Sequence, residues 1–374
     1  MIFSLKYLTL HKQKQTTVDK VIITNDVCRK LTNVLQQIEH DRLFLLCDKT
    51  TYQLCYPVIQ EVKGIADATH IIIGATDTHK NLQTISQVWT EMGNGGGTRH
   101  SLMINLGGGM VTDLGGFAAS TFKRGIPFVN IPTTLLSMVD ASVGGKTGIN
   151  FNGLKNEIGV FNQPQTVIID TMFLRTLDPQ NICSGYAEML KHGLISDQKT
   201  FYELLAFDLN DVDYAHLADM VGTSVAVKER IVTDDPHEHG IRKALNLGHT
   251  VGHAFESFAL QFEDKPNNPH GIQPVLHGYA VAWGLICELY LSCIKTGFPT
   301  DIMRQTVRFI QEAYGTLPIT CDDYPQLFEF MTHDKKNTAG TINFTLLGGI
   351  GDIRINQTAT KEEIYDMLDF FREG

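Results

Sequence analysis

The sequence predicts two domains, an α/β domain built on a parallel sheet and then a mainly helical domain. The chain has 374 residues, which is more than a single hydrophobic core usually supports. In the first half, short runs rich in β-branched residues alternate with amphipathic segments, a pattern typical of a parallel sheet covered by helices. In the second half, apolar residues recur at helical spacing. We therefore expect domains at 1–178 and 179–374.

Short apolar runs predict the strands of the sheet. They are Val21–Thr24, Arg42–Cys47, His70–Gly74, Ser101–Leu106, Pro127–Ile131 and Thr166–Ile169. Asn81–Met92 is an amphipathic segment of the kind expected to cover such a sheet. Glycines follow the strands directly at Gly107–Gly109, which indicates tight turns at the strand ends.

Helical spacing dominates the second domain. The expected helices are Tyr186–Leu194, Phe201–Leu209, Leu217–Ile231, Val251–Leu260, Tyr279–Ile294 and Ile302–Tyr314. Residues 263–276 are rich in Pro, Asn and Gly and predict a loop, and Thr341–Leu347 predicts a strand. A last helix is expected to begin at Thr360, with Glu363 completing a capping box.

Composition excludes several classes of protein. Hydrophobic residues make up 43% and charged residues 19%, as in ordinary globular proteins. The net charge of -10 argues against nucleic acid as a partner, although a local cationic pocket could still bind an anionic small molecule. We find no signal peptide and no run long enough to span a membrane. The seven scattered cysteines lack CxxC spacing, so we expect reduced thiols and a cytoplasmic location.

A glycine-rich turn is the first candidate binding element. Gly107–Gly109 follows an apolar strand and precedes a helix-like run, where backbone N–H groups can bind a phosphate. The pattern is not GxGxxG, and an ordinary tight turn is the alternative. Asp48 follows another strand, where an acid that binds a ribose would lie. Together the two features favour a nucleotide.

Histidines on apolar helices indicate a metal site. His249 and His253 are four residues apart and share one helical face. His277 begins another apolar helix, and Glu188 lies within an earlier one. Each could instead be a hydrogen-bonded core residue, and spacing alone does not decide which of them bind metal. HExxH is absent, so a zincin protease is not indicated.

Cationic residues in apolar surroundings form a third group, which comprises Lys146, Lys155, Lys191, Lys228, Arg242 and Lys335–Lys336. The alternative for each is a solvated surface charge. Lys146 and Lys155 lie among glycines and apolar residues, so we expect them to be the least solvated. A nucleotide-triphosphate P-loop is not indicated, because Asp140 stands where its first glycine should be.

These motifs resemble the 3-dehydroquinate synthase family of sugar-phosphate cyclases. The segments that carry the resemblance are Gly107–Phe117, Lys123–Gly125, Pro132–Leu136, Val139–Gly148, Lys155–Asn156, Tyr186–Gly193, Asn246–His253, Leu276–Gly278 and Asp334–Lys336. They follow the family's order from about residue 70 to 350, and the resemblance is weaker before residue 65.

The resemblance implies a fold and a reaction. The fold is a Rossmann-like N-terminal domain, an all-α metal-binding C-terminal domain and an active site in the cleft between them. The cofactors are NAD and Zn²⁺ or Co²⁺. The reaction is the conversion of the sugar phosphate 3-deoxy-D-arabino-heptulosonate 7-phosphate to 3-dehydroquinate and phosphate, a carbon–oxygen lyase step of the shikimate pathway. The alternatives are a cyclase for another sugar phosphate and a metal-dependent polyol dehydrogenase, which would release NADH.

The resemblance also implies residue roles. The metal ligands become Glu188, His249 and His277, and His253 handles protons instead. The NAD contacts become Asp48, Asp77, Lys80, Gly108, Gly109, Asp113, Thr133, Thr134, Lys155 and Thr176. The substrate positions become Asp140, Lys146, Asn156, Lys191, Lys228, Arg242, Asn246 and Lys335. Arg124 corresponds to a residue that reaches a neighbouring subunit's site, which implies a homodimer.

Three positions depart from the family pattern. Tyr279 and Asp77 replace glutamates, and Thr50 replaces an asparagine near the ribose acid. The departures affect the details of NAD contact more than the reaction. Lys228 and Arg242 suit a carboxylate, which favours the dehydroquinate substrate over other sugar phosphates.

Overall fold

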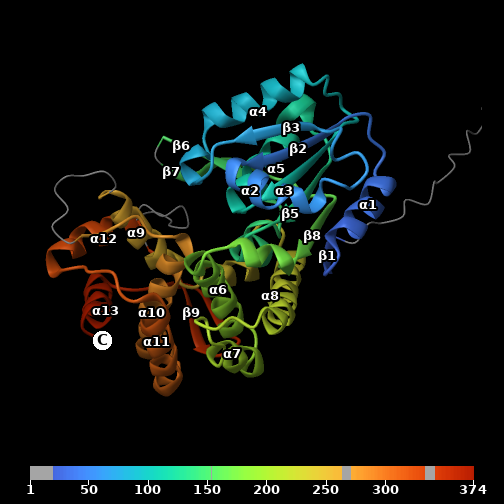
Figure 1. Cartoon of the computed structure of the whole chain (residues 1–374). Helices are drawn as coiled ribbons and strands as arrows, with labels where there is room; N and C mark the ends of the chain where they lie inside the picture. Colours follow the sequence, from blue (N-terminus) through green and yellow to red (C-terminus); the bar gives the residue numbers. More distant parts are fainter. Residues whose placement is uncertain (1–19, 153, 263–270, 333–341) are drawn as a thin grey trace, which may run out of the picture.

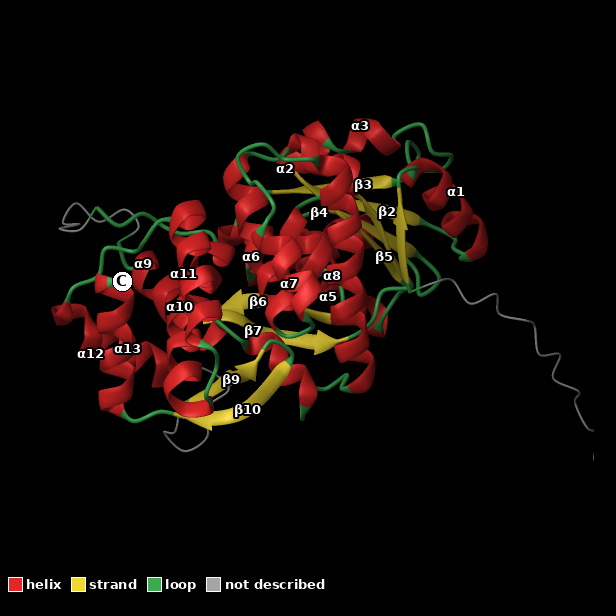
Figure 2. Cartoon of the chain, turned by 90° about the horizontal axis from the view of Figure 1, so that it is seen from below, coloured by secondary structure: helices red, strands yellow, loops and turns green. Residues whose placement is uncertain are grey.

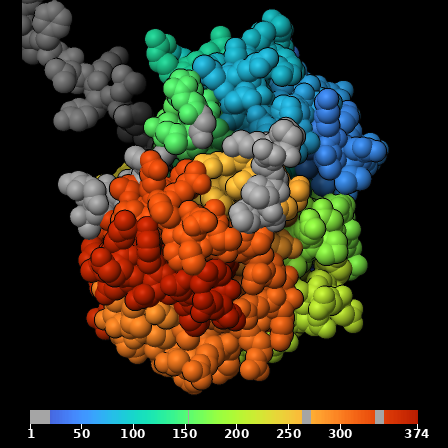
Figure 3. All heavy atoms as spheres, turned by 90° about the vertical axis from the view of Figure 1, so that its left-hand side faces the viewer, coloured from blue at the N-terminus to red at the C-terminus, as the bar shows by residue number. Residues whose placement is uncertain are grey.

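The computed structural model describes residues 20–152, 154–262, 271–332 and 342–374. Figure 1 shows a sheet half, blue to green, and a helical half, yellow to red. The two halves pack directly on each other, with the sheet half above in Figure 3. Lys335 and its neighbours Asp334 and Lys336 lie outside the described residues, as do residues 263–270 of the expected loop.

A six-stranded parallel sheet forms the core of the first half. Its order is β1-β8-β5-β4-β2-β3. The strands are β1 (Val21–Thr24), β2 (Leu43–Asp48), β3 (Thr69–Ile73), β4 (Leu102–Gly107), β5 (Phe128–Pro132) and β8 (Thr166–Asp170). All six coincide with predicted strands to within one or two residues, and the α/β class is confirmed.

Helices cover both faces of this sheet. They are α1 (Val27–Gln37), α2 (Lys49–Leu54), α3 (Tyr56–Ile59), α4 (Leu82–Asn94) and α5 (Gly109–Thr121). Successive residues of a strand point to opposite faces. On β2, Leu45 therefore joins the core beneath α1 and α3, which continues into the helical half. Its neighbour Phe44 joins a separate core beneath α4 and α5.

The strand order contains a topological switch point. From β2 the chain runs outward to β3, then returns past β2 to β4 and continues to β5 in the other direction. Nucleotides bind in open α/β sheets at the carboxyl ends of the strands that flank such a switch. Asp48 ends β2, and Gly108 directly follows β4, so both candidates lie at this point.

An antiparallel hairpin, β6 (Lys146–Phe151) and β7 (Leu154–Phe161), packs on α5 and was not predicted. Its β7 strand is exposed along its length, so no buried face gives the sequence an alternating pattern. Figure 2 shows this hairpin apart from the main sheet.

The second half is helical, as predicted. Its helices are α6 (Pro179–Leu194), α7 (Gln198–Leu205), α8 (Tyr214–Asp234), α9 (His249–Leu260), α10 (His277–Thr296), α11 (Thr300–Tyr314), α12 (Tyr324–Thr332) and α13 (Lys361–Glu373). Helix α10 is central and packs against α6, α9, α11 and α13. Thr360 and Glu363 form the predicted capping box of α13.

The description of the second half as all-α needs one correction. The half also contains an antiparallel hairpin, β9 (Asn343–Gly349) and β10 (Asp352–Thr358). Strand β9 was expected from its apolar run, whereas the polar β10 was not.

In the described part of the chain, no helix is long and apolar enough to cross a bilayer. All seven cysteines carry free thiols.

Candidate active site

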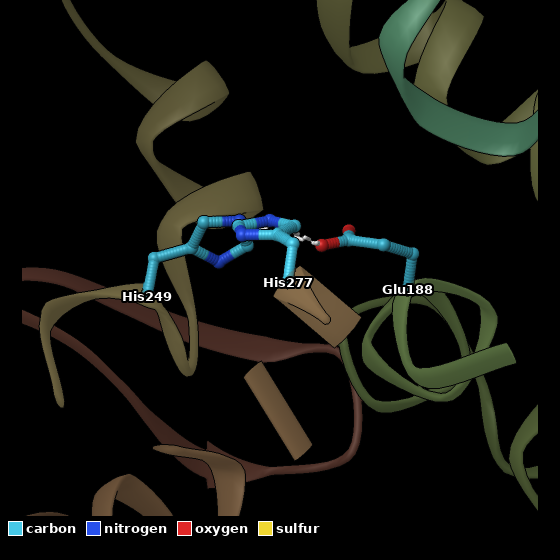
Figure 4. A group of neighbouring side chains, drawn as sticks. All are labelled: Glu188, His249 and His277. Atoms are coloured by element: carbon cyan, nitrogen blue, oxygen red, sulfur yellow. Dashed lines mark ion pairs between the residues drawn. The ribbon is translucent and has the colours of Figure 1, made fainter. Parts of the chain in front are cut away.

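Three side chains from three helices converge in the helical half. Glu188 comes from the middle of α6, and His249 and His277 are the first residues of α9 and α10. The Glu188 Oε1 atom lies 3.4 Å from His249 Nε2 and 3.6 Å from His277 Nε2. Figure 4 shows the two imidazoles and the carboxylate pointing toward one another. The structure thus brings together the three residues expected to bind metal.

The geometry of this cluster fits a tetrahedral divalent cation. Bonds of about 2.0–2.1 Å to zinc place neighbouring ligand atoms about 3.4 Å apart in a tetrahedron. The three donor atoms all lie within 4.8 Å of one another. The Glu188 Oε1 atom is buried and accepts no hydrogen bond, which is unfavourable for a carboxylate oxygen unless a cation binds it. The residues therefore fit a metal such as Zn²⁺ or Co²⁺.

The charges around the cluster favour a cation. Burial raises the pKa of the Glu188 carboxyl, but Lys191 and His249 outweigh burial and hold that pKa well below its usual range. Burial lowers the pKa of His277, but Glu188 and Glu256 outweigh it and raise that pKa to about 10. The two carboxylates thus stabilise positive charge on the ring, and a divalent cation at the same place supplies that charge instead.

The start of α9 is fixed against α10. Gly248 precedes His249 with φ of 80°, and a Cβ there would lie 2.9 Å from Leu285 on α10. The Glu288 carboxylate of α10 accepts hydrogen bonds from the N–H groups of Gly248 at 2.7 Å and Thr250 at 3.0 Å. A carboxylate at a helix N-terminus is favourable, and it sets the position of the His249 backbone.

His253 lies one turn after His249 on α9 and adjoins the same cluster. Its ring centroid is 5.4 Å from that of His249 and 5.9 Å from that of His277. The group of potential ligand atoms formed by Glu188, His249 and His277, all within 4.8 Å of one another, does not include His253. The shared face of His249 and His253 therefore brings both rings to the site, with His253 at its edge.

Two buried lysines adjoin the metal cluster. Lys191 is 1% exposed and forms an ion pair with Glu188. Lys228 on α8 is 6% exposed, and its Nζ atom donates to Asp140 Oδ1 at 2.6 Å. Burial raises the pKa of Asp140, but Lys228 outweighs it and the pKa falls well below the usual range. Asp140 lies in the turn of π-helix Ser137–Ala141, so this pair joins the two halves.

Arg242 is also buried between the two halves. Its Nη2 atom donates to the Gly144 carbonyl at 3.0 Å and its Nη1 atom to the Pro236 carbonyl at 2.6 Å. The Nε–H group is buried and has no hydrogen-bond partner. The guanidinium lies over the Phe161 ring. A rigid donor fork with an unused N–H suits recognition of an anion.

Glu238 is a site residue that the sequence reasoning missed. It forms an ion pair with Lys146, and its Oε1 atom accepts a hydrogen bond from Asn246 Nδ2 at 2.8 Å. Its surroundings, Asp-Asp-Pro-His-Glu-His-Gly, have the composition of a solvated loop. Its position in the sequence carries no signal, because only the folded chain brings Lys146 from β6 next to it.

The expectation that Lys146 and Lys155 are the least solvated cations is wrong. The Lys146 side chain is 52% exposed and the Lys155 side chain 41% exposed. Lys191 and Lys228, by contrast, are almost fully buried. Lys146 is the exposed first residue of β6, although Thr147, Gly148 and Ile149 after it are buried, and Lys155 lies on the exposed strand β7. The buried lysines lie instead on packed helices.

The residues expected to bind NAD follow the carboxyl ends of the parallel strands. Asp48 caps α2 and is 7% exposed. Gly108 and Gly109 begin α5, and Thr133 and Thr134 directly follow β5. Asp77 and Lys80 lie after β3, and Thr176 lies after β8. These residues follow strands on both sides of the switch point.

The glycine turn leaves room that a side chain would fill. A Cβ at Gly108 would lie 3.0 Å from Thr134 Cγ2, and a Cβ at Gly109 would lie 3.1 Å from the Ala141 Cβ. The Thr133 hydroxyl is buried and has no hydrogen-bond partner. A narrow cradle with an unused hydroxyl at the N-terminus of α5 fits a dinucleotide phosphate.

Lys80 connects the sheet half to the β6–β7 hairpin. Its side chain is 5% exposed, and its Nζ atom lies 2.6 Å from Asp113 Oδ2. It also donates to the side chain of Asn156. Burial raises the pKa of Asp113, and Lys80 opposes that effect. The sequence-predicted Lys80, Asp113 and Asn156 are thus in contact.

Arg124 is the one predicted site residue of the described chain that lies far from the others. It is exposed and follows α5 at the end opposite Gly109. Helix α5 has 13 residues, so the two ends are about 20 Å apart. Arg124 does not join the site of its own chain.

All three departures from the family pattern have visible contacts. Asp77 Oδ2 lies 3.4 Å from Lys155 Nζ and accepts a hydrogen bond from Asn150 at 3.0 Å. Tyr279 packs edge-on against Tyr314 within the helical half, away from the three ligand atoms. Thr50 donates its backbone N–H to Asp48 at 2.8 Å, which any residue can do.

Comparison with known proteins identifies the family. The family model described as 3-dehydroquinate synthase N-terminal matches residues 70–184, and that described as 3-dehydroquinate synthase C-terminal matches residues 185–337. A 3-dehydroquinate synthase of Parabacteroides distasonis is 52% identical over 95% of this chain and 98% of its own. One of Oceanobacillus iheyensis is 36% identical over 88% and 90%.

Solved structures share the fold. ValA, a 2-epi-5-epi-valiolone synthase of Streptomyces hygroscopicus with NAD⁺ and Zn²⁺ bound, has a TM-score of 0.81 at 24% identity and covers 100% of this chain and 99% of its own. A 2-deoxy-scyllo-inosose synthase complexed with carbaglucose-6-phosphate, NAD⁺ and Co²⁺ has a TM-score of 0.79 at 23% identity, with 95% and 96% covered.

The parallel-sheet half with its glycine cradle and the helical half with its three-ligand cluster define a protein of the sugar-phosphate cyclase type. The two family models together span residues 70–337, and the relative from Parabacteroides distasonis is similar along nearly the whole chain. The chain belongs to the 3-dehydroquinate synthase family.

Proposed function

We propose that the chain catalyses the conversion of 3-deoxy-D-arabino-heptulosonate 7-phosphate to 3-dehydroquinate and phosphate. The observation that carries this proposal is the convergence of Glu188, His249 and His277, beside buried cations, in a chain 52% identical to a 3-dehydroquinate synthase. When bound, NAD⁺ accepts a hydride and later returns it, and Zn²⁺ or Co²⁺ lowers the pKa of the substrate hydroxyl that is oxidised. The enzyme is therefore a lyase that causes no net oxidation or reduction, and its reaction is a step of the shikimate pathway.

The three ligands would hold the cation, and His253 would move a proton at the edge of the site. His253 suits this role because an imidazole has one nitrogen that can donate a proton and one that can accept it, and its ring adjoins both ligand rings. Lys191 would orient a substrate hydroxyl, because its ammonium contacts the ligand Glu188.

The remaining cations divide between the two anionic ends of the substrate. Lys228 and Arg242 would bind the carboxylate, because both are buried and the guanidinium has an unused N–H. Lys146 and Asn156, together with Lys335, would bind the phosphate. Lys146 and Asn156 are exposed, and an exposed position lets phosphate leave. Asp140 and Asn246 would hold Lys228 and Glu238 in place.

The NAD⁺ site would lie at the switch point of the sheet. Gly108, Gly109, Thr133 and Thr134 would contact the pyrophosphate, and Asp48 the ribose. The residues Asp77, Lys80, Asp113, Lys155 and Thr176 would complete the site. The contacts of Lys80 with Asp113 on α5 and with Asn156 on β7 support this assignment, because together they join the hairpin to α5.

We further propose a homodimer in which Arg124 serves the partner's phosphate site. Its distance from its own site supports this arrangement, as do the exposed apolar side chains of β7, Leu154, Ile158, Val160 and Phe161. When the Arg124→Ala and His277→Ala proteins are mixed in equal amounts, about half of the dimers should contain one subunit of each. Each such dimer has one intact site, so the mixture should recover about a quarter of wild-type activity. No recovery on mixing would contradict a shared site.

The free thiols support a reducing, cytoplasmic location.

Substrate selectivity tests the proposed reaction. Phosphate release is measured from 3-deoxy-D-arabino-heptulosonate 7-phosphate and from glucose 6-phosphate, which lacks the carboxylate. The wild type should release phosphate only from the first, and Arg242→Gln should lose that activity by about 100-fold or more. Arg304→Gln, on the exposed face of α11, is the control. Release from glucose 6-phosphate instead would indicate a cyclase for another sugar phosphate.

A further inference from the structure

The Glu256 carboxylate lies between the metal site and the NAD side of the molecule. Its Oε2 atom is 3.4 Å from His277 Nδ1, the ring nitrogen that faces away from Glu188. Its Oε1 atom accepts a hydrogen bond from Lys155 Nζ at 2.6 Å. Lys155 belongs to β7 and His277 to α10. The two oxygens of Glu256, which itself lies on α9, therefore contact different halves of the molecule.

Glu256 is buried and charged, which is costly unless its partners are fixed. The residue is 4% exposed. Its carboxylate forms ion pairs with Lys155 through Oε1 and with His277 through Oε2. A buried carboxylate that loses one of two such partners is strongly unfavourable. The positions of His277 and Lys155 are therefore linked through this one group.

We propose that Glu256 is a positioning residue that couples occupation of the metal site to NAD⁺ affinity, an inference that rests on the proposed function. A cation on His277 Nε2 fixes the ring, and the ring then orients Glu256 through Nδ1. Carboxylates that contact a metal-bound histidine in this way tune metal affinity. Glu256 in turn holds Lys155, the neighbour of Asn156, which contacts Lys80. Metal binding thus orders the residues proposed to contact NAD⁺.

Coupling of this kind is reciprocal and measurable without catalysis. Co²⁺ binding is followed by its visible absorption, and NAD⁺ binding by calorimetry on metal-free and Co²⁺-loaded protein. The wild type should bind NAD⁺ more tightly when loaded, by about 5- to 150-fold. Glu256→Gln should weaken Co²⁺ binding by about 10- to 100-fold, alter the cobalt spectrum, and bring the ratio of the two NAD⁺ affinities close to 1.

Two further variants separate coupling from simple damage to the metal site. Lys155→Met should lose the NAD⁺ coupling but keep the wild-type cobalt spectrum, because it lies beyond Glu256. Glu288→Gln should weaken Co²⁺ binding through His249 but keep the coupling, because Glu288 contacts the first turn of α9, whereas Lys155 contacts Glu256. Glu256→Asp, whose shorter carboxylate cannot span both partners, replaces Glu256→Gln if that variant does not fold.

The inference is overturned if folded Glu256→Gln or Glu256→Asp keeps the wild-type ratio of NAD⁺ affinities. It is also overturned if Lys155→Met keeps that ratio, or if the wild type binds both ligands without coupling. These results would leave the proposed function intact. Failure of the wild type to bind Co²⁺ or NAD⁺ at all would instead contradict the proposed function.

Discussion

Glu288 is expected to stabilise the metal site although it contacts no ligand side chain. It is a fully buried carboxylate on α10. Its Oε2 atom accepts from Gly248 N at 2.7 Å, and its Oε1 atom accepts from Thr250 N at 3.0 Å and Val251 N at 3.3 Å. These N–H groups belong to the first turn of α9, where no intrahelical partner exists. Glu288→Gln keeps the shape but changes these bonds.

The magnitude follows from the three hydrogen bonds. The amide oxygen keeps the two Oε1 bonds, but each weakens by about 1 kcal/mol on losing the charge. The amide NH₂ group cannot accept from Gly248 N, and that buried N–H then costs about 1–3 kcal/mol. The free energy of unfolding should therefore fall by about 3–5 kcal/mol, and Co²⁺ affinity should fall with it because His249 begins the same turn.

The assay is thermal and urea unfolding of the metal-free protein, followed by Co²⁺ titration. Glu312→Gln, an exposed carboxylate on α11, is the matched control and should change stability by less than about 0.5 kcal/mol. If Glu288→Gln unfolds like Glu312→Gln and binds Co²⁺ like the wild type, the carboxylate does not anchor α9 and the reasoning is wrong.

Three further predictions follow from buried groups. Burial lowers the pKa of His192 from 6.5 to about 3, so between these two pH values the folded protein binds fewer protons than the unfolded chain. The free energy of unfolding should therefore fall as pH falls below 6.5, by about 1.4 kcal/mol per pH unit. In urea unfolding, His192→Asn should lose less stability over the same pH range. Lys228→Met leaves Asp140 without its partner, so the free energy of unfolding should fall by about 3 kcal/mol. Adding Asp140→Asn to Lys228→Met should restore part of this loss. If the double variant is no more stable than Lys228→Met, the ion pair does not account for the loss. Gly108→Ala fills the space beside Thr134 and should weaken NAD⁺ binding by about tenfold, equal to about 1.4 kcal/mol, and unchanged calorimetric affinity would argue against a phosphate there.

The sheet and most helices could be predicted because burial leaves a pattern in the sequence. Strand β4 is buried on both faces and appears as a continuous apolar run. The missed elements lack such a pattern. Strand β7 is exposed throughout, and β10 has only two apolar residues, Ile353 and Ile355, neither of them fully buried. Neither strand therefore has an apolar run like those of the main sheet. The domain boundary at residue 178 stays a prediction, and the two family models meet at 184 and 185, within α6.

The site was predictable in its residue types and in its resemblance to a family, but not in its supporting contacts. Histidines at helix starts are uncommon enough to attract attention. Glu256, Glu288 and Glu238 carry no such signal, because a single glutamate in a helix or loop most often lies in solvent. Only the packing of α9 on α10, together with the contacts that Lys155 and Lys146 of the β6–β7 hairpin make with Glu256 and Glu238, gives these carboxylates their partners.

The central claim is that the chain performs an elimination and ring closure in which NAD⁺ is regenerated at a metal-dependent site. Phosphate release from 3-deoxy-D-arabino-heptulosonate 7-phosphate, with a catalytic amount of NAD⁺ and with absorbance recorded for NADH, tests it most directly. The account predicts stoichiometric phosphate without net NADH, loss of activity after chelation, and recovery with Zn²⁺ or Co²⁺. Accumulation of NADH without phosphate, or full activity after the metal is removed, would contradict it.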